Sequence, residues 1–331
     1  LIFFAAVYLA YFFLLPLGGG VAKSHGYEHA ILFSSPFLIL YYLALFSVAY
    51  GKVFLVVAGI ALVIQKIFYW PSYHATFATS GLFAERGREI SNRVALGTVL
   101  SVLAPAVGGF VIATSGFTAL FLGVAALILA SNIPLLRTPE YFKPEPFRYF
   151  AALSRVFARS RRRAFWSALG YGEELIALVV WPLFIVTVVH DLFSAGLVIS
   201  LSMLATAVGV LYVGRLCDER GRDGILRAGV IATAASWLVR PFIGSGLGVF
   251  GADTFYRLAR YFMGVPYMAA VYERAQRGFA VEEVVAFEMT LALGKVLAAL
   301  GCVWAFMVWP ESWAPVFTIA ALFSLLYAKM K

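Results

Sequence analysis

Long apolar segments, broken only by short polar stretches, fill the chain from its first residue to its last. A helix needs about 20 mostly apolar residues to cross a bilayer, and only helices and closed barrels satisfy their backbone there. The segments lack the alternation of apolar and polar positions that a barrel strand requires, so they predict helices. The predicted membrane-spanning helices are eleven, at about residues 1–17, 30–50, 53–75, 93–114, 117–136, 164–190, 194–213, 225–246, 249–272, 286–309 and 312–328.

The composition supports this prediction. Of the 331 residues, 62% are hydrophobic and 13% are charged, and the mean hydropathy is +0.89. Such a chain is too apolar for a water-soluble surface, so the expected fold class is an all-α polytopic membrane protein. The two cysteines, Cys217 and Cys302, lie far apart in the sequence and indicate no disulfide framework.

Lysine and arginine are distributed unevenly between the two sides of the predicted helices. If the connections alternate between the sides, 20 of the 26 basic residues fall on one side, and the opposite connections hold only Lys52. Basic connections stay in the cytoplasm, so we expect this side to be cytoplasmic and the protein to lie in the plasma (inner) membrane. The net charge of +9 then reports membrane topology, and no nucleic-acid partner is predicted.

The longest connection, residues 137–163, separates two groups of predicted helices. It begins with RTPEYFKPEPF, whose three prolines favour an extended chain. The residues that follow, RYFAALSRVFARSRRR, place Phe150 and Phe157 among arginines at helical spacing. Such a basic amphipathic segment fits either a helix on the anionic inner leaflet or a solvated linker, and the sequence leaves both open.

A shift of 195 residues aligns the second part of the chain with the first. It pairs Gly214 with Gly19 and Gly221 with Gly26, and it brings five predicted helices of each part into register. The helix at 164–190 has no partner, so we expect twelve helices in the intact protein, the first of them before residue 1. The expected organisation is an N-terminal bundle at 1–136 (helices 2 to 6), a basic cytoplasmic linker at 137–163 and a C-terminal bundle at 164–331 (helices 7 to 12).

The polar stretch GRLCDERGR resembles the G-x-L-x-D-x-x-G-R signature of the major facilitator superfamily of transporters. The resemblance implies two parallel bundles of six helices that open a central site to alternate sides of the membrane. It also implies that this loop makes a tight cytoplasmic turn whose aspartate pairs with a neighbouring helix end and helps to close one side. The matching residues are Gly214, Leu216, Asp218, Gly221 and Arg222.

The first copy of this gating motif contains Gly19, Lys23 and Gly26, so a lysine stands where the signature has aspartate. A cation at a helix start is unfavourable unless a carboxylate intervenes. The family geometry therefore predicts an inverted ion pair, in which Lys23 faces a glutamate-rich helix start and Asp218 faces an arginine-rich one. The expected facing residues are Glu282, Glu283 and Glu288 for Lys23, and Arg86, Arg88 and Arg93 for Asp218.

A second resemblance is to the G-P-x-x-G-G element on the fifth helix of proton-coupled antiporters. Within APAVGGF, the residues Pro105, Gly108 and Gly109 match it, while Ala104 replaces the first glycine. This departure leaves two interpretations open, namely antiport and simple close packing of helices through small residues.

Seven charged residues fall well inside predicted helices, where each requires a partner or a water-filled cavity. Asp253 and Arg257 are spaced for a local ion pair, and a glutamate at 173–174 lies at a depth that would reach Lys295. Lys66 and Arg260 have no evident partner and nearly coincide under the repeat, so we expect both to face one central cavity. The residues of the expected substrate or proton pathway are Lys66, Glu173, Glu174, Asp253, Arg257, Arg260 and Lys295.

Three further polar residues near predicted helix ends are expected outside this pathway. Arg240 should extend its guanidinium to the outer interface. His74 and His190 should have structural roles only.

No enzyme motif is present, since the sequence lacks HExxH, GxSxG and a phosphate loop. We predict no catalytic residue, no metal site and no cofactor. We predict a secondary active transporter for a small anionic solute, with a glutamate as proton carrier. The alternatives are proton-driven efflux of amphipathic compounds and a non-transporting scaffold or sensor. A monomer in the lipid bilayer is expected, and the sequence leaves the substrate, the direction of transport and the coupling ion open.

Overall fold

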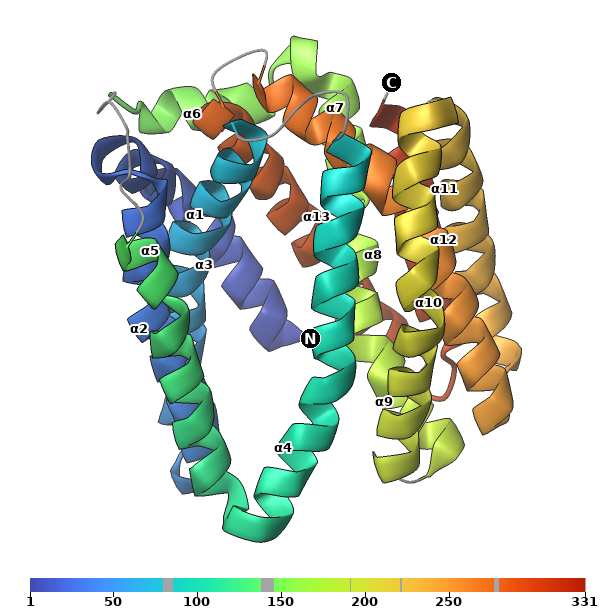
Figure 1. Ribbon diagram of the computed structural model, residues 1–331. Helices are drawn as coiled ribbons and strands as arrows, with labels where there is room; N and C mark the ends of the chain where they lie inside the picture. Colours follow the sequence, from blue (N-terminus) through green and yellow to red (C-terminus); the bar gives the residue numbers. More distant parts are fainter. Residues whose placement is uncertain (80–85, 138–145, 191, 221, 277–279, 331) are drawn as a thin grey trace.

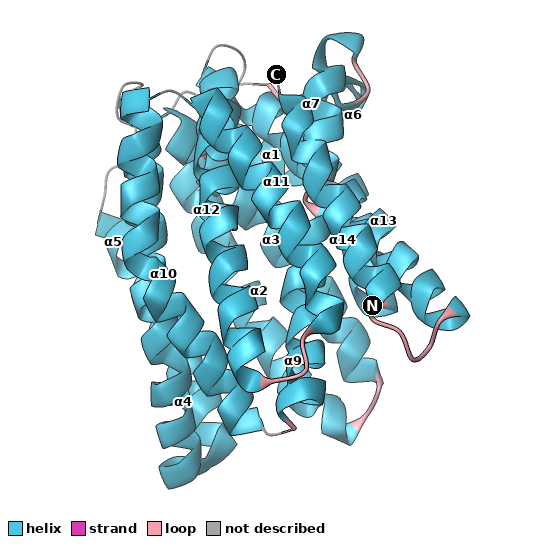
Figure 2. Cartoon of the chain, turned by 90° about the vertical axis from the view of Figure 1, so that its right-hand side faces the viewer, coloured by secondary structure: helices cyan, strands magenta, loops and turns pink. Residues whose placement is uncertain are grey.

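The chain folds into a bundle of long helices (Figures 1 and 2). The computed structural model describes residues 1–79, 86–137, 146–190, 192–220, 222–276 and 280–330, and these residues contain no β-strand. The helices before the linker are α1 (Ile2–His25), α2 (Tyr27–Phe46), α3 (Val53–Thr79), α4 (Arg86–Ser131) and α5 (Ile133–Arg137), with a 3-10 turn at Ser47–Tyr50.

The linker contains α6 (Tyr149–Val156) and a 3-10 turn at Arg159–Arg161. The helices that follow are α7 (Arg162–Leu169), α8 (Gly172–Leu175), α9 (Trp181–Val189), α10 (Leu192–Arg220), α11 (Arg222–Val239), α12 (Gly246–Gln276), α13 (Ala280–Val308) and α14 (Ala314–Leu326). Short 3-10 turns lie at Arg240–Phe242 and Tyr327–Met330.

Each predicted membrane span lies on a helical segment. Within the described residues, eight segments are long and apolar enough to cross a membrane, so the chain is an integral membrane protein. The element α4 covers two predicted spans, because two helical arms meet at a bend at Gly116, whose backbone is not helical. Gly116 has a φ of 79°, which a residue without a Cβ adopts at little cost, and Figure 1 shows the two arms of α4 diverging from this bend.

The span predicted at 164–190 is a helix with an irregular middle. Between α8 and α9 the residues Ile176–Val180 form a π-helical turn. Pro182 follows after Trp181 and has no N–H to donate to the carbonyl four residues earlier, and a wider turn avoids the ring's clash with that carbonyl. Such turns often occur at functional sites, and Glu173 and Glu174 lie just before this one.

Two interfaces dominate the packing between the residues before and after the linker. The helix α1 packs along α13, and α4 packs along α10. Shifted by 195 residues, α1 falls on 197–220 within α10. Shifted back by the same number, residues 281–308 of α13 fall on 86–113, the first arm of α4. The two interfaces are therefore equivalent under the repeat, as expected when two copies related by a twofold axis pack together.

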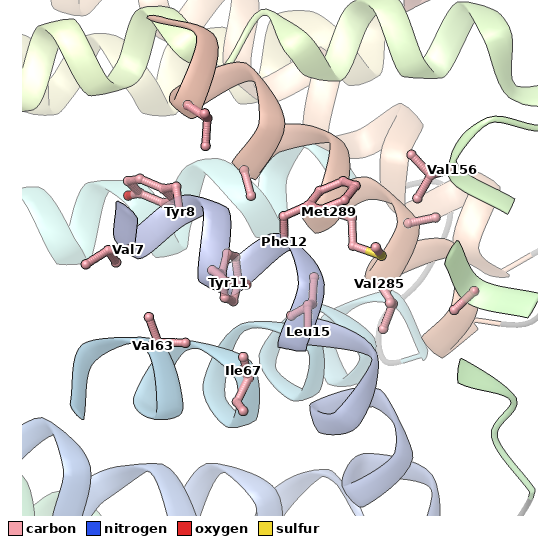
Figure 3. Packing of buried hydrophobic residues seen from close by; sticks show 14 of the residues in the cluster. Val7, Tyr8, Tyr11, Phe12, Leu15, Val63, Ile67, Val156, Val285 and Met289 are labelled. Carbon is pink, nitrogen blue, oxygen red and sulfur yellow. The ribbon is translucent and has the colours of Figure 1, made fainter. Parts of the chain in front are cut away.

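The contact between α1 and α13 is a large apolar core. Leu15 and Tyr11 of α1 are almost fully buried, together with Val285 and Met289 of α13. Figure 3 shows this row of α1 side chains lying between α13 on one side and Ile67 and its neighbours of α3 on the other.

Two glycines allow the helix before the π turn to cross α13 at very short distance. A Cβ on Gly294 would lie 2.4 Å from the carbonyl oxygen of Leu169, and a Cβ on Gly172 would lie 2.6 Å from the carbonyl oxygen of Gly294. This crossing places Glu174 directly beside Lys295, the residue after Gly294. The backbone contact therefore determines where the charges of this region lie.

We expect Gly294→Ala to lower the melting temperature of the purified protein. Backbone atoms cannot move aside as a flexible side chain can, and overpacking of this kind costs about 1–3 kcal/mol. The matched control is Gly301→Ala in the same helix, where the new Cβ would lie 3.5 Å from Ile319, an ordinary contact. Thermal unfolding in detergent measures both, and equal melting temperatures would contradict the close crossing.

Candidate functional site

A cavity of about 260 Å³ lies between α1 and α3 on one side and α8, α12 and α13 on the other. Its wall brings together residues from both sides of the linker. Its titratable residues other than tyrosine are Lys66, His74, Glu174, Arg260, Glu288 and Lys295. Its aromatic residues are Tyr8, Tyr11, Trp70, Tyr171, Tyr261, Tyr272 and Phe287.

Lys295 and Glu174 form the closest ion pair of the cavity wall. The Lys295 Nζ lies 2.6 Å from Glu174 Oε2, and it also lies 5.0 Å from the centre of the Tyr8 ring. The predicted bridge between Lys295 and a glutamate of α8 is confirmed. The tight crossing at Gly294 explains why the pair forms.

Arg260 was predicted to lack a partner, and this prediction is wrong. Its guanidinium lies 3.5 Å from Glu174 Oε1 and 3.7 Å from Glu173 Oε2. Two adjacent carboxylates of the short α8, those of Glu173 and Glu174, lie near Arg260 of α12. The spacing of residues within one helix does not predict such a contact between two helices. Arg260 therefore contacts both glutamates while lining the cavity.

Lys66 lines the same cavity without a carboxylate within 4.0 Å among the described residues. Its Nζ instead lies over three aromatic rings, at 5.2 Å from the centre of Tyr8, 5.9 Å from Tyr11 and 5.7 Å from Trp70. Ring faces attract a cation more weakly than an ion pair does in a desolvated place. The positive charge of Lys66 is therefore only partly compensated.

His74 lines the cavity. The prediction that it has a structural role only did not anticipate this position. Its Nε2 lies 3.1 Å from Glu288 Oε1, and its Nδ1 lies 2.8 Å from the hydroxyl of Tyr272. Glu288 also accepts a hydrogen bond of 2.9 Å from Tyr11. The sequence carries a usable signal, because Lys66, Trp70 and His74 repeat every four residues and therefore share one helix face.

A second polar cluster is buried behind the cavity. The predicted pair of Asp253 and Arg257 is confirmed, with 2.7 Å between Arg257 Nε and Asp253 Oδ2. Asp253 also accepts a hydrogen bond of 2.8 Å from Trp181. Glu173 is fully buried and accepts hydrogen bonds from the ring N–H of Trp237 and the hydroxyl of Tyr256. Glu173, Asp253 and Arg257 do not line the cavity.

Arg240 is buried in this cluster and does not reach the outer interface, so that prediction is wrong. The centre of its guanidinium lies 3.8 Å from the ring centres of Trp181 and Trp237 and 4.4 Å from that of Tyr256. Stacking on aromatic rings suits the planar guanidinium and replaces the aqueous contact that was expected. His190, by contrast, is exposed and ends α9 in a left-handed conformation.

The inverted ion pair predicted for the first gating motif is present. The Lys23 Nζ at the end of α1 lies 2.7 Å from Glu282 Oε1 at the start of α13. Glu283 instead forms ion pairs with two arginines of the linker. Its Oε1 lies 3.2 Å from Arg155 Nε, and its Oε2 lies 2.9 Å from Arg161 Nη2. Glu288 does not join them, because it lies further along α13 and faces His74 in the cavity.

The two glycines of the first motif occupy a close contact and a turn. A Cβ on Gly19 would lie 2.8 Å from the Val285 side chain and 2.9 Å from the Phe147 ring, so a larger residue there would displace these side chains. Gly26 separates α1 from α2 with a φ of 94°. These are the positions at which the repeat pairs Gly214 and Gly221.

The second motif is described only in part. The helix α10 continues through Gly214 and Leu216 to Arg220, and Arg222 at the start of α11 pairs with Glu273. Gly221 and the Asp218 side chain lie outside the described residues, as do the side chains of Arg86 and Arg93. The predicted partner of Asp218 is therefore not seen.

In the fifth-helix element, Gly108 lies on α4 with its nearest neighbour at an ordinary contact distance, 3.8 Å from Leu120. The Pro105 side chain and the surroundings of Gly109 lie outside the described residues. Among the residues that the structure describes, no group of three or more His, Cys, Asp or Glu side chains is placed to hold a metal ion.

The sequence matches no family model and no curated protein. Comparison of structures, however, finds close similarity at low sequence identity. The fucose:proton symporter FucP of E. coli has a TM-score of 0.71 at 13% identity, over 99% of this chain and 89% of that one. The human organic anion transporter MFSD10 has a TM-score of 0.74 at 16% identity, over 99% and 83%.

The proton:xylose symporter XylE has a TM-score of 0.70 at 12% identity, over 98% of this chain and 83% of that one. Similarity of this extent at such identities is a similarity of fold. Together with the cavity between the two sides of the bundle and the inverted pair at the end of α1, it shows that this chain has the fold of the major facilitator superfamily transporters.

Proposed function

We propose that this protein is a secondary active transporter that moves a small anionic solute across the inner membrane by alternating access. One observation carries the proposal: a cavity between the two sides of the bundle contains the incompletely compensated cation Lys66. Transporters bind their substrates at such an interface between repeats, near the middle of the membrane.

The balance of charge in the cavity supports an anion. Lys66, Arg260 and Lys295 line the cavity with only two carboxylates, Glu174 and Glu288. Glu174 forms ion pairs with both Lys295 and Arg260, and Glu288 pairs with His74. A substrate carboxylate or phosphate at Lys66 would supply the missing counterion, because an uncompensated charge inside a bundle is costly.

The size of the cavity supports a small solute. Its volume of about 260 Å³ corresponds to roughly nine water molecules at about 30 Å³ each. Pockets for drug-sized ligands usually measure about 300–1,000 Å³. Efflux of amphipathic compounds remains the second candidate, favoured by the many aromatic side chains of the wall, whereas a scaffold role would suit an interior in which every charge is paired.

Proton coupling is proposed at the pair of Glu288 and His74. Glu288 belongs to α13, while its partners His74 and Tyr11 belong to α3 and α1 on the other side of the bundle. A proton that neutralised this carboxylate would weaken the contact between the two sides. Protonation would thereby favour their separation, which is what coupling to alternating access requires.

The gate is proposed on the side that carries the basic linker, which we infer to be cytoplasmic. There the pair of Lys23 and Glu282 joins the end of α1 to the start of α13. Arg155 and Arg161 attach the linker to Glu283, the adjacent residue. Opening the cavity toward the cytoplasm would require these contacts to separate. A monomer is sufficient for this cycle, because both sides of the cavity come from one chain.

We expect Lys66→Gln to reduce the apparent affinity for the transported anion by about tenfold or more, the usual effect of losing a hydrogen bond to a charged group. Uptake of labelled organic acids and phosphate esters into proteoliposomes measures the change. Lys66→Arg should retain part of the affinity, and the exposed Lys52→Gln serves as the control. Arg260→Gln is less informative, since it also strips buried Glu173 of its cation. Unchanged anion uptake by Lys66→Gln would exclude this assignment.

Glu288→Gln should abolish accumulation driven by a proton gradient while preserving exchange of substrate for substrate across the same membrane. The neutral amide keeps the shape of the side chain but cannot take up and release a proton. Proteoliposomes with an imposed pH gradient, compared with counterflow at equal pH, separate the two activities. Glu311→Gln, at an exposed position, is the control. Gradient-driven accumulation by Glu288→Gln would rule out Glu288 as the proton carrier.

We expect Lys23→Glu to open the gate by placing like charges together, and the double variant Lys23→Glu, Glu282→Lys to close it again. Spin labels at the linker-side ends of α1 and α13, in a background without Cys217 and Cys302, report the distance between these ends. The single variant should show a larger fraction of long distances than the parent, and the double variant should restore the parent distribution. Distance distributions that are the same in all three proteins would mean that this pair does not bias the gate.

A further inference from the structure

Two adjoining hollows lie on the linker side of the second group of helices, away from the central cavity. The first, of about 460 Å³, is lined by Arg162, Arg163, Trp166, Leu326 and Lys329. The second, of about 240 Å³, shares Arg162 and Trp166 and adds Phe157 and Arg159 to its wall. We call the two together the basic groove.

The basic groove is strongly positive. No acidic residue lines either hollow. Arg159, Arg162 and Lys329 are exposed, and no described carboxylate lies within 4.0 Å of them. The neighbouring Arg161 is turned inward to Glu283, so this short segment sends one arginine into the gate and others into the groove.

The groove also has an apolar wall that a soluble protein would not expose. Trp166 is 44% exposed and Phe157 is 62% exposed. Trp166 lies about two turns inside the membrane span that begins at Arg159, and Leu326 closes α14 just before Lys329. The cations therefore lie at the level where the spans emerge from the membrane, with apolar side chains directly on their hydrocarbon side. Tryptophan and basic residues occupy these depths in membrane proteins.

We propose that the basic groove binds the headgroup of an anionic phospholipid. The phosphate would lie among Arg159, Arg162 and Lys329, and an acyl chain would run along Trp166 and Leu326. A soluble anion would use the cations but would gain nothing from the exposed aromatic wall. The positive charge matches the anionic lipids of a cytoplasmic leaflet, each basic residue near such a surface adding to the attraction. This site is separate from the proposed substrate cavity and does not depend on transport.

The test is lipid binding by the full chain in detergent, measured by native mass spectrometry with phosphatidylglycerol and with phosphatidylcholine of equal acyl length. We expect a bound phosphatidylglycerol to be preferred. Arg162→Gln and Arg159→Gln should each lower its apparent affinity about fivefold, and the effects should combine in the double variant. Arg162→Lys, which keeps the charge, should retain most of the affinity.

Arg227→Gln is the matched control, because it removes an exposed arginine from the linker-side half of α11 without touching the groove. Equal losses in this control and in Arg162→Gln would mean diffuse attraction and would overturn the proposal. Equal binding of the two lipids would also overturn it. If millimolar inorganic phosphate displaces the lipid completely, the site is one for soluble anions and the lipid assignment fails.

Discussion

The cost of a charge inside the membrane governs how this bundle is assembled. Water cannot solvate the side chains of the interior, so each ionic group requires a partner, an aromatic face or a wet cavity. The structure contains examples of all three. Lys295 pairs with a carboxylate, Arg240 stacks on three aromatic rings, and Lys66 faces the cavity. The close crossing at Gly172 and Gly294 is what makes the first solution available.

The adjacent residues Glu173 and Glu174 connect the cavity to the buried cluster behind it. Glu174 faces Lys295 at the cavity, while Glu173 holds Trp237 and Tyr256 in the interior of the second group of helices. Arg260 touches both carboxylates. A change of charge at Glu174 in the cavity would therefore alter the packing of α11 and α12, because the adjacent residue Glu173 of α8 contacts both helices. This is a contiguous physical path, and the irregular turn that follows α8 lies at its end.

The sequence was sufficient for the helices, for the fold and for ion pairs whose partners follow from helical spacing or from the family resemblance. Asp253 with Arg257 follows from helical periodicity, and Lys23 with Glu282 follows from the loop geometry that the resemblance implies. The pairing of Arg260 and the burial of Arg240 could not be predicted in this way. Spacing along a helix gives the depth of a side chain in the membrane, but not the identity of the neighbouring helix that it meets.

The cavity positions of His74 and Glu288 were missed for a related reason. His74 and Glu288 each lie near the end of a predicted span, where a polar residue is usually solvated, and only the packing of α3 against α13 places them together. The repetition of Lys66, Trp70 and His74 along one face was a signal for this cavity. It was not specific by itself, because a stripe of polar and aromatic residues also suits a helix that simply packs in the core.

The inverted charges of the two motifs bear on how the halves recognise each other. Lys23 meets Glu282, and the residue at the position equivalent to 282, after the 195-residue shift, is 87, between Arg86 and Arg88. If the first half paired with a second copy of itself in the same geometry, Lys23 would meet arginines. Such a pairing would place like charges together at both ends of its symmetric interface. The charge at the end of α1 therefore favours the start of α13 over the equivalent helix start of its own half.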